Sequence, residues 1–172
     1  ALVARRGTEL QAWVNAQGWT LTQARVYAAD VRDVRSIVDA GRACIAEQGL
    51  PDAVVANAGI SVGFDTADFD DLEVLRATFE TNNLGMAATF HPFVAAMGQR
   101  GSGRLVGIAS VAGIRGLPGH GAYSASKAAA ISYCESLRVE CAPRGVKVVT
   151  LLPGYIDTPL TQGNRYSMPF LM

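Results

Sequence analysis

Short apolar runs alternate with longer amphipathic segments along the whole chain, and this alternation restricts the possible folds more than any other feature. We expect strands at residues 1–4, 24–29, 52–56, 103–109 and 146–151. Helices are predicted at residues 8–17, 32–48, 72–100 and 122–142, with a short turn near 66–69. Repeated β-α units of this kind bury a parallel sheet on both faces. The predicted fold is therefore α/β, a doubly wound parallel sheet in three α/β/α layers.

The 172 residues are predicted to form a single domain, because no repeat, linker or low-complexity stretch divides them. A hydrophobic content of 49% and a charged content of 17% argue against a disordered chain. The net charge of zero gives no electrostatic reason to expect nucleic acid or an anionic membrane as partner. No apolar run approaches the ~18 residues of a membrane span, and no signal-peptide pattern opens the chain. We therefore expect a cytoplasmic protein.

Tyr123 and Lys127 lie four positions apart in a predicted helix, so they share one face of it. A free phenol loses its proton only near pH ~10, but a neighbouring ammonium stabilises the phenolate. The pair is thus suited to general acid/base catalysis, and a serine hydroxyl beside it could hydrogen-bond the substrate oxygen. Ser110, at the end of the preceding strand, is the candidate. Taken alone, the Tyr-x-x-x-Lys pattern is common and far more often marks a plain surface pair on a helix.

Further motifs accompany this pair. They are Asn57-Ala58-Gly59 after the third strand, Asn82 with Gly85 three positions later, Ser110-Val111-Ala112-Gly113, and residues 151–158 with Pro153-Gly154. In this order and spacing, the set resembles the short-chain dehydrogenase/reductase family over nearly the whole chain. The resemblance implies a Rossmann-like fold and an NAD(P)-dependent oxidoreductase. Such an enzyme transfers a hydride between the cofactor and a carbonyl or alcohol carbon of a small or medium organic substrate.

The resemblance also implies roles for the catalytic candidates. Tyr123 would move the proton of the substrate oxygen, and Ser110 would orient and polarise that oxygen. Lys127 would hold the nicotinamide ribose and favour the phenolate. Asn82 would bend its helix and hold a water in a relay to Lys127, with a solvent-facing polar residue as the alternative, and Asn83 is interpreted as incidental.

Arg5 and Arg6, at the end of the first strand, indicate the choice of cofactor. A carboxylate at this position would select NAD, whereas a cation pairs with the 2′-phosphate of NADP. Guanidinium groups bind phosphate in bidentate geometry, so we expect NADP. The alternative is that the two arginines only begin an exposed helix.

Other cofactor contacts are implied by the resemblance. Asp30, with Val31, matches the position that reaches the adenine amino group, although Asp30 could also cap the helix beginning near Arg32. Gly59 would let the backbone approach the cofactor, and Asn57 would brace the sheet. The cofactor-binding candidates are Arg5, Arg6, Asp30, Val31, Asn57, Ala58, Gly59, Tyr123, Lys127, Pro153, Gly154, Ile156 and Thr158.

The chain opens inside a strand, without the Gly-rich turn that precedes this strand in the family. We therefore expect the family's first strand and its C-terminal elements to lie outside the 172 residues. The substrate-covering segment follows Thr158, so substrate identity cannot be read. A catalytically silent relative that binds nucleotide or acts as a scaffold is the alternative function. The presence of Asn82, Ser110, Tyr123 and Lys127 together favours the enzyme.

The cysteines, Cys44, Cys134 and Cys141, lack metal-ligand spacing, so no metal site is expected. We interpret them as small buried residues rather than disulfide partners. Residues 128–131 follow the catalytic pair and are mostly alanine, which permits close approach of another helix. The family commonly pairs these helices between subunits, so a homodimer or homotetramer is predicted.

Overall fold

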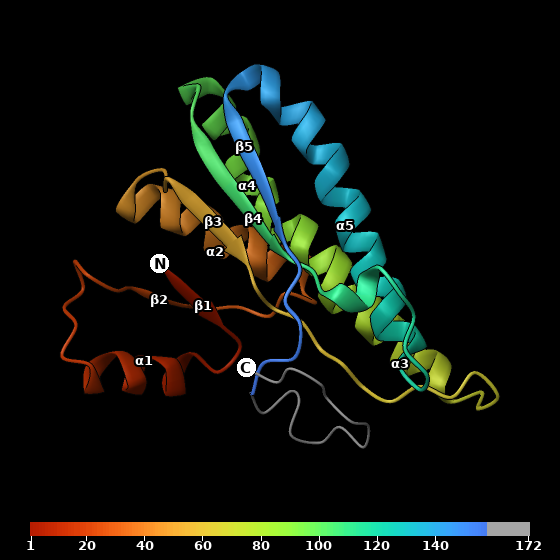
Figure 1. Cartoon of the computed structure of the whole chain (residues 1–172). Helices are drawn as coiled ribbons and strands as arrows, with labels where there is room; N and C mark the ends of the chain where they lie inside the picture. Colours follow the sequence, from red (N-terminus) through yellow and green to blue (C-terminus); the bar gives the residue numbers. More distant parts are fainter. Residues whose placement is uncertain (158–172) are drawn as a thin grey trace.

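The computed structural model describes residues 1–157, in which strands and helices alternate (Figure 1). The strands are β1 (Leu2–Ala4), β2 (Val26–Ala28), β3 (Ala53–Ala56), β4 (Gly103–Ile108) and β5 (Val146–Leu151). The helices are α1 (Gly7–Ala16), α2 (Val34–Gln48), α3 (Asp71–Phe79), α4 (Gly85–Arg100) and α5 (Gly121–Cys141), with short 3₁₀ turns at Val111–Gly113 and Ala142–Arg144. None of the helices described is long and apolar enough to span a membrane. Each predicted strand is present. Thr158, one of the predicted cofactor contacts, lies outside the described residues.

The strands form two parallel sheets within the described residues, β1-β2 and β3-β4-β5. In the larger sheet, Ala56 pairs with Gly107 and Ile108 pairs with Leu151, so the three strands run in register toward one edge. The predicted α/β class with parallel strands is confirmed. The two sheets separate between β1 and β3, the place where the resemblance puts the family's first strand, which was expected to lie outside the 172 residues.

Helices cover both faces of the β1-β2 sheet. Tyr27 of β2 packs toward the cluster that contains Ile37 and Val38 of α2. The neighbouring residue Ala28 lies against Gly7, the first residue of α1. Because successive side chains of a strand point to opposite faces, α1 and α2 lie on opposite sides of this sheet. This is the doubly wound arrangement that the alternation of elements predicts.

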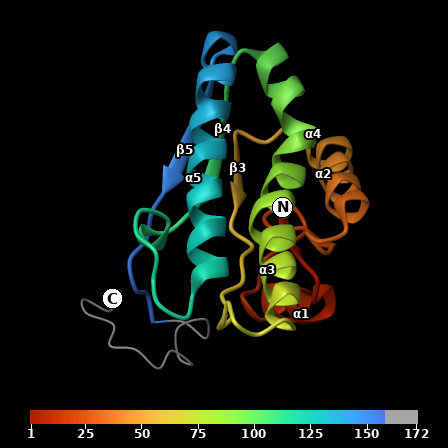
Figure 2. The ribbon, with the colours of Figure 1, turned by 90° about the vertical axis from the view of Figure 1, so that its right-hand side faces the viewer.

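The main core lies between the larger sheet and helices α4 and α5, which run side by side in front of the strands in Figure 2. Its fully buried side chains include Phe90, Met97, Leu105 and Cys134. Gly107 leaves room for this packing, because a Cβ at that position would lie only 2.6 Å from the Cys134 sulfur. All three cysteines are buried and free, as predicted.

The predicted helix over residues 72–100 is wrong as a single α-helix, because a π-helical turn at Glu80–Leu84 separates α3 from α4. Hydroxyl groups compete with the backbone near its start: Thr78 Oγ1 donates to the Val74 carbonyl at 2.7 Å, and Thr81 Oγ1, within the turn, donates to the Ala77 carbonyl at 2.8 Å. A π-turn widens a helix by one residue and is frequent at functional sites. The two halves still continue as one rod (Figure 2).

Helix α2 begins two residues later than predicted, at Val34. The Asp33 carboxylate accepts hydrogen bonds from the backbone N–H groups of Arg35 (3.0 Å) and Ser36 (3.1 Å), which satisfies the first turn. The N-cap is therefore Asp33, and the prediction that Asp30 could cap this helix is wrong.

Candidate active site

The ends of three parallel strands bring distant segments together at one edge of the larger sheet. Asn57 follows β3, Ser110 lies just beyond β4, and Pro153 lies just beyond β5. The backbone N–H of Ala109 donates to the Leu151 carbonyl (2.8 Å), and that of Val111 donates to the Pro153 carbonyl (3.1 Å). Ligands of open parallel sheets bind outside this carboxyl edge.

Ser110 is held at this edge by the turn that it begins. Its Oγ accepts a hydrogen bond from the Ala112 N–H at 3.1 Å and donates a long one to the Pro153 carbonyl at 3.5 Å. Only 7% of the residue is exposed. A hydroxyl can accept two hydrogen bonds and donate one, so Ser110 keeps one acceptor position, and its donor can serve another partner by turning away from Pro153.

Tyr123 and Lys127 lie in the first turns of α5. The Lys127 ammonium is buried, donates to the Ile108 carbonyl at the end of β4 (2.8 Å), and lies 5.6 Å from the centre of the Tyr123 ring. Burial lowers the pKa of Lys127 from its ordinary value of 10.5 to about 8. An ammonium has three N–H donors, so two remain for other partners. Within residues 1–157, the half-buried Tyr123 side chain makes no hydrogen bond through its hydroxyl.

Asn82 lies in the π-helical turn and is 1% exposed, so its interpretation as a solvent-facing residue is wrong. Its Oδ1 accepts from the Ile60 N–H (2.8 Å), and its Nδ2 donates to the Ile60 carbonyl (3.0 Å). Nδ2 also donates to Ser126 Oγ of α5 (2.9 Å). The Asn82 amide therefore joins the loop after β3 to the catalytic helix.

Gly59 lies between Asn82 and Lys127. A Cβ at this position would lie 3.3 Å from Asn82 Oδ1 and 3.5 Å from Lys127 Nζ. The structure thus brings three predicted site residues together. Asn57 and Ala58 are exposed, and no hydrogen bond of the Asn57 side chain is found in residues 1–157, so the expected bracing of the sheet is not seen there.

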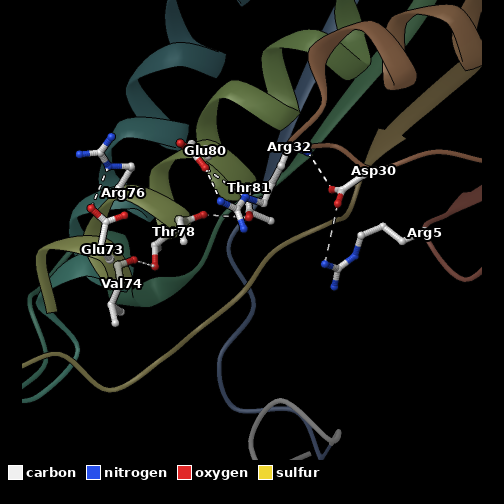
Figure 3. A network of polar contacts seen from close by, with 10 residues as sticks. Arg5, Asp30, Arg32, Glu73, Val74, Arg76, Thr78, Glu80 and Thr81 are labelled. Atoms are coloured by element: carbon white, nitrogen blue, oxygen red, sulfur yellow. Dashed lines mark hydrogen bonds and ion pairs between the residues drawn. The ribbon is translucent and has the colours of Figure 1, made fainter. Parts of the chain in front are cut away.

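The candidates for the adenosine end of the site form a row of charges (Figure 3). Arg5 Nη1 lies 3.9 Å from Asp30 Oδ2, and Asp30 Oδ1 accepts a hydrogen bond from the Arg32 backbone N–H at 2.9 Å. The Arg32 guanidinium in turn donates to Glu80 at the start of the π-helical turn (2.6 Å). Arg6 instead pairs with Glu9 of α1 at 3.0 Å.

Val31, the residue after Asp30, packs against Gly85 at the start of α4, where a Cβ would lie 2.9 Å from that of Val31. Close packing here places the loop after β2 beside the π-helical turn. In the segment after β5, Pro153 is half-buried, whereas Gly154 and Ile156 are exposed. Thr158 cannot be placed because it lies outside the described residues.

The sequence did not point to Ser126 as part of the site, nor did it show that Gly113 packs against the helix that carries Lys127. Ser126 is fully buried beside Asn82. A Cβ on Gly113 would lie 2.7 Å from the Lys127 carbonyl carbon, so this glycine lets the Ser110 turn contact α5. The available signals were a serine directly before Lys127 and a glycine three residues after Ser110. Neither signal specifies a partner without the fold.

Comparisons with known proteins agree with this geometry. Residues 1–168 match the family described as short chain dehydrogenase. An uncharacterized oxidoreductase of Myxococcus xanthus is 44% identical over 143 residues, which are 83% of this chain and 56% of that protein. An acetoacetyl-CoA reductase of Synechocystis is 36% identical over 149 residues, covering 84% of this chain and 60% of the relative.

A solved short-chain dehydrogenase from Streptomyces avermitilis has the same fold, with a TM-score of 0.82 and 34% sequence identity. The likeness covers 92% of this chain and 57% of that structure. The chain therefore spans somewhat more than half the length of these two proteins, the Myxococcus relative and the Streptomyces structure. The match over residues 1–168 and the shared fold lead to one conclusion: the chain belongs to the short chain dehydrogenase family.

Proposed function

We propose that this protein is an oxidoreductase that transfers a hydride between NADP(H) and the carbonyl or alcohol carbon of a small or medium organic substrate. The observation that carries the proposal is the convergence of Ser110, Tyr123, Lys127 and Asn82 from separate segments at the carboxyl edge of the sheet. The ketone-reducing activity named for the Synechocystis relative supports the same reaction type.

The residues at this edge fit a dinucleotide. Gly59 presents no side chain where Asn82 and Lys127 come close, and within residues 1–157 no atom lies within 4 Å of the position that a Cβ on Gly154 would take. Arg5, Arg6, Asp30 and Val31 would hold the adenosine end. The nicotinamide end would be held by Asn57, Ala58, Gly59, Tyr123, Lys127, Pro153, Gly154, Ile156 and Thr158.

A bound nicotinamide dinucleotide would supply or accept the hydride. The Tyr123 hydroxyl, which has no partner within residues 1–157, would give a proton to the substrate oxygen or take one from it. Ser110 would turn its hydroxyl from the Pro153 carbonyl, 3.5 Å away, and donate a hydrogen bond to the same oxygen. Lys127 is positively charged at neutral pH because its pKa is about 8, and its free N–H donors would bind the ribose hydroxyls. Asn82 would hold the loop after β3 against α5 throughout.

The exposure of Arg5 supports NADP over NAD. Its side chain is 66% exposed and is paired with Asp30 only at 3.9 Å. An exposed ion pair of this kind contributes about 0–1 kcal/mol, whereas a hydrogen bond to a charged phosphate contributes about 1.5–3 kcal/mol. Arg5 would therefore leave Asp30 for a 2′-phosphate.

Helix α5 supports the proposal of a homodimer or homotetramer. Ala128 is exposed beside the catalytic turn, and Val139, which is 74% exposed, lies about three turns farther along the same face of the helix. A partner helix would cover these side chains. A cytoplasmic location stays a prediction from the sequence.

The test of the reaction is NADPH oxidation by the full-length protein with a panel of ketones and aldehydes, including acetoacetyl-CoA. Tyr123→Phe keeps the ring but removes the hydroxyl, so turnover should fall by about 10²–10⁴-fold while NADPH binding is retained. Tyr133→Phe makes the same change on the same helix outside the site and should leave turnover unchanged. A Tyr123→Phe enzyme with most of its activity would contradict the proposed function.

A further inference from the structure

The π-helical turn directs two adjacent asparagines to one residue of α5. Asn82 Nδ2 donates to Ser126 Oγ at 2.9 Å, and Asn83 Nδ2 donates to the Ser126 backbone carbonyl at 2.8 Å. Successive side chains of a regular α-helix point about 100° apart, which keeps neighbours from meeting one residue of an adjacent helix. Asn83, interpreted from the sequence as incidental, thus makes a structural contact with α5.

Ser126 passes this contact on to Tyr123. It is 0% exposed, and its Oγ donates to the Tyr123 carbonyl at 2.7 Å. Ser126 also directly precedes Lys127, whose ammonium and the Asn82 amide oxygen both lie close to the position that a Cβ on Gly59 would take. A single buried hydroxyl thus connects the loop after β3, through Asn82, to the backbone of the catalytic turn.

The hydrogen bonds of Asn82 show that its side chain maintains this geometry. Both N–H groups of Nδ2 are used, one by the Ile60 carbonyl and one by Ser126, and Oδ1 accepts from the Ile60 N–H. An amide nitrogen has only two donors, so none is left for a substrate. What the Asn82 amide sets is the distance between the Ile60 loop and α5.

Asn83 contacts Ser126 even though, within residues 1–157, one of its own polar atoms is left without a hydrogen bond. Among the described residues, its Oδ1 is buried without a hydrogen-bond partner, while its Nδ2 is bonded to Ser126. A buried polar atom without a partner destabilises a fold and calls for an explanation. The second link between the π-helical turn and α5 provides one.

We propose that Ser126 is a positioning residue for the reaction: its hydroxyl holds Tyr123 in register with Asn82 and the loop at Gly59. This inference rests on the proposed function. Ser126 touches neither substrate nor the transferred proton, because its hydroxyl is buried between Asn82 and the Tyr123 backbone. Its loss should therefore lower kcat and leave the KM for NADPH nearly unchanged.

The test compares kcat and KM of three full-length variants. Ser126→Cys keeps a side chain of similar size but replaces the hydroxyl with a weakly hydrogen-bonding thiol, and we expect kcat to fall about tenfold with less than a twofold change in KM for NADPH. Ser126→Thr keeps the hydroxyl and should retain kcat within about threefold. The matched control is Ser124→Cys, at a buried serine of α5 whose Oγ accepts from the Leu117 N–H (3.2 Å) and should leave kcat unchanged.

A double variant tests whether Ser126 acts through Asn82. In an Asn82→Ala background the contact is already lost, so Ser126→Cys should lower kcat further by less than about twofold. An equal tenfold loss in both backgrounds, or wild-type kcat in Ser126→Cys, would overturn the inference. Ser126→Ala, expected to lose about tenfold as well, gives the same comparison if the thiol variant does not fold. Activity retained by Tyr123→Phe would instead refute the proposed function itself, so the two failures are distinguishable.

Discussion

Gly113 lies against the backbone of Lys127. A Cβ added to this glycine would come within 2.7 Å of the Lys127 carbonyl carbon and within 2.9 Å of the following backbone nitrogen, that of Ala128. Gly113 ends the 3₁₀ turn that begins after Ser110, so the contact fixes the serine turn against the helix that carries the tyrosine and lysine. Lack of space, rather than a special backbone conformation, requires glycine here.

Gly113→Ala should therefore both destabilise the protein and lower its activity. Overpacking of this kind costs about 1–3 kcal/mol, and the shift of Ser110 relative to Tyr123 should reduce kcat at least tenfold. Urea denaturation and steady-state kinetics measure the two effects. Gly116→Ala is the matched control, because a Cβ at Gly116 meets nothing within 4 Å. Equal behaviour of the two variants would show that the Gly113 contact does not matter.

Burial of Lys127 should make stability depend on pH in a defined window. The pKa is about 8 in the folded protein and near the ordinary 10.5 in the unfolded chain, so the unfolded state binds more protons between these values. Wild-type stability should therefore rise with pH across this window, relative to Lys127→Met, which lacks the group. The difference in unfolding free energy should change by about 3 kcal/mol. Denaturation of both proteins at pH 7 and at about pH 10.5 measures it, and a constant difference would contradict the prediction.

The loss of the Lys127 proton should also change kcat as a function of pH. As pH rises through about 8, Lys127 loses its charge, and with it the ability to stabilise a tyrosine phenolate or orient the ribose. We expect kcat for NADPH-dependent reduction to decline above this pH. A pH–rate profile in buffers of constant ionic strength tests this, and a rate that stays flat to about pH 10 would argue that the charge has no part in turnover.

Arg5→Ala should weaken NADP binding by about tenfold or more and leave NAD binding unchanged, because only NADP carries the 2′-phosphate. Arg6→Ala should have the smaller effect, since Arg6 pairs with Glu9. Cofactor titration followed by fluorescence gives both affinities. Arg42→Ala, which removes another exposed arginine paired only with Asp39 of its own helix, is the control. Equal NADP affinity in Arg5→Ala and wild type would mean that Arg5 does not reach the phosphate.

A charge at the exposed face of α5 should disrupt assembly. Val139→Asp places a carboxylate at a position that is 74% exposed in the single chain, so it should leave the fold intact while it destabilises a helix-to-helix interface. Light scattering at micromolar concentration should show a dimer or tetramer for wild type and a smaller species for the variant. A monomeric wild-type protein would refute the assembly proposal.

Local patterns were sufficient to predict much of this fold. A short, nearly continuous apolar run such as residues 103–109 indicates a strand buried on both faces of a parallel sheet, and β4 forms at Gly103–Ile108. The four-residue spacing of Tyr123 and Lys127 likewise depends only on helix geometry, and α5 contains both. Predictions of this type succeed because the interactions responsible lie within one element.

Features that depend on partners far along the chain could not be predicted. The π-helical turn is stabilised by contacts of Asn82 and Asn83 with Ser126 of α5, more than 40 positions away. The resemblance implied a bend at Asn82, but the local sequence does not specify a π-turn. The start of α2 was misplaced for a smaller reason, since Asp30 and Asp33 both have capping side chains and only backbone geometry decides between them. The role of Ser126 becomes visible only once two helices are packed.

A π-helical turn places one more residue in a turn than an α-helix does, so Glu80–Leu84 holds an extra residue with little net rotation between α3 and α4. Thr78 of α3 and both Phe90 and Met97 of α4 are buried on either side of it. Deletion of one residue would return the segment to an ordinary helix and turn the side chains of Asn82 and Asn83 away from their shared partner, Ser126. Natural variation in this segment should therefore conserve its length together with these two asparagines.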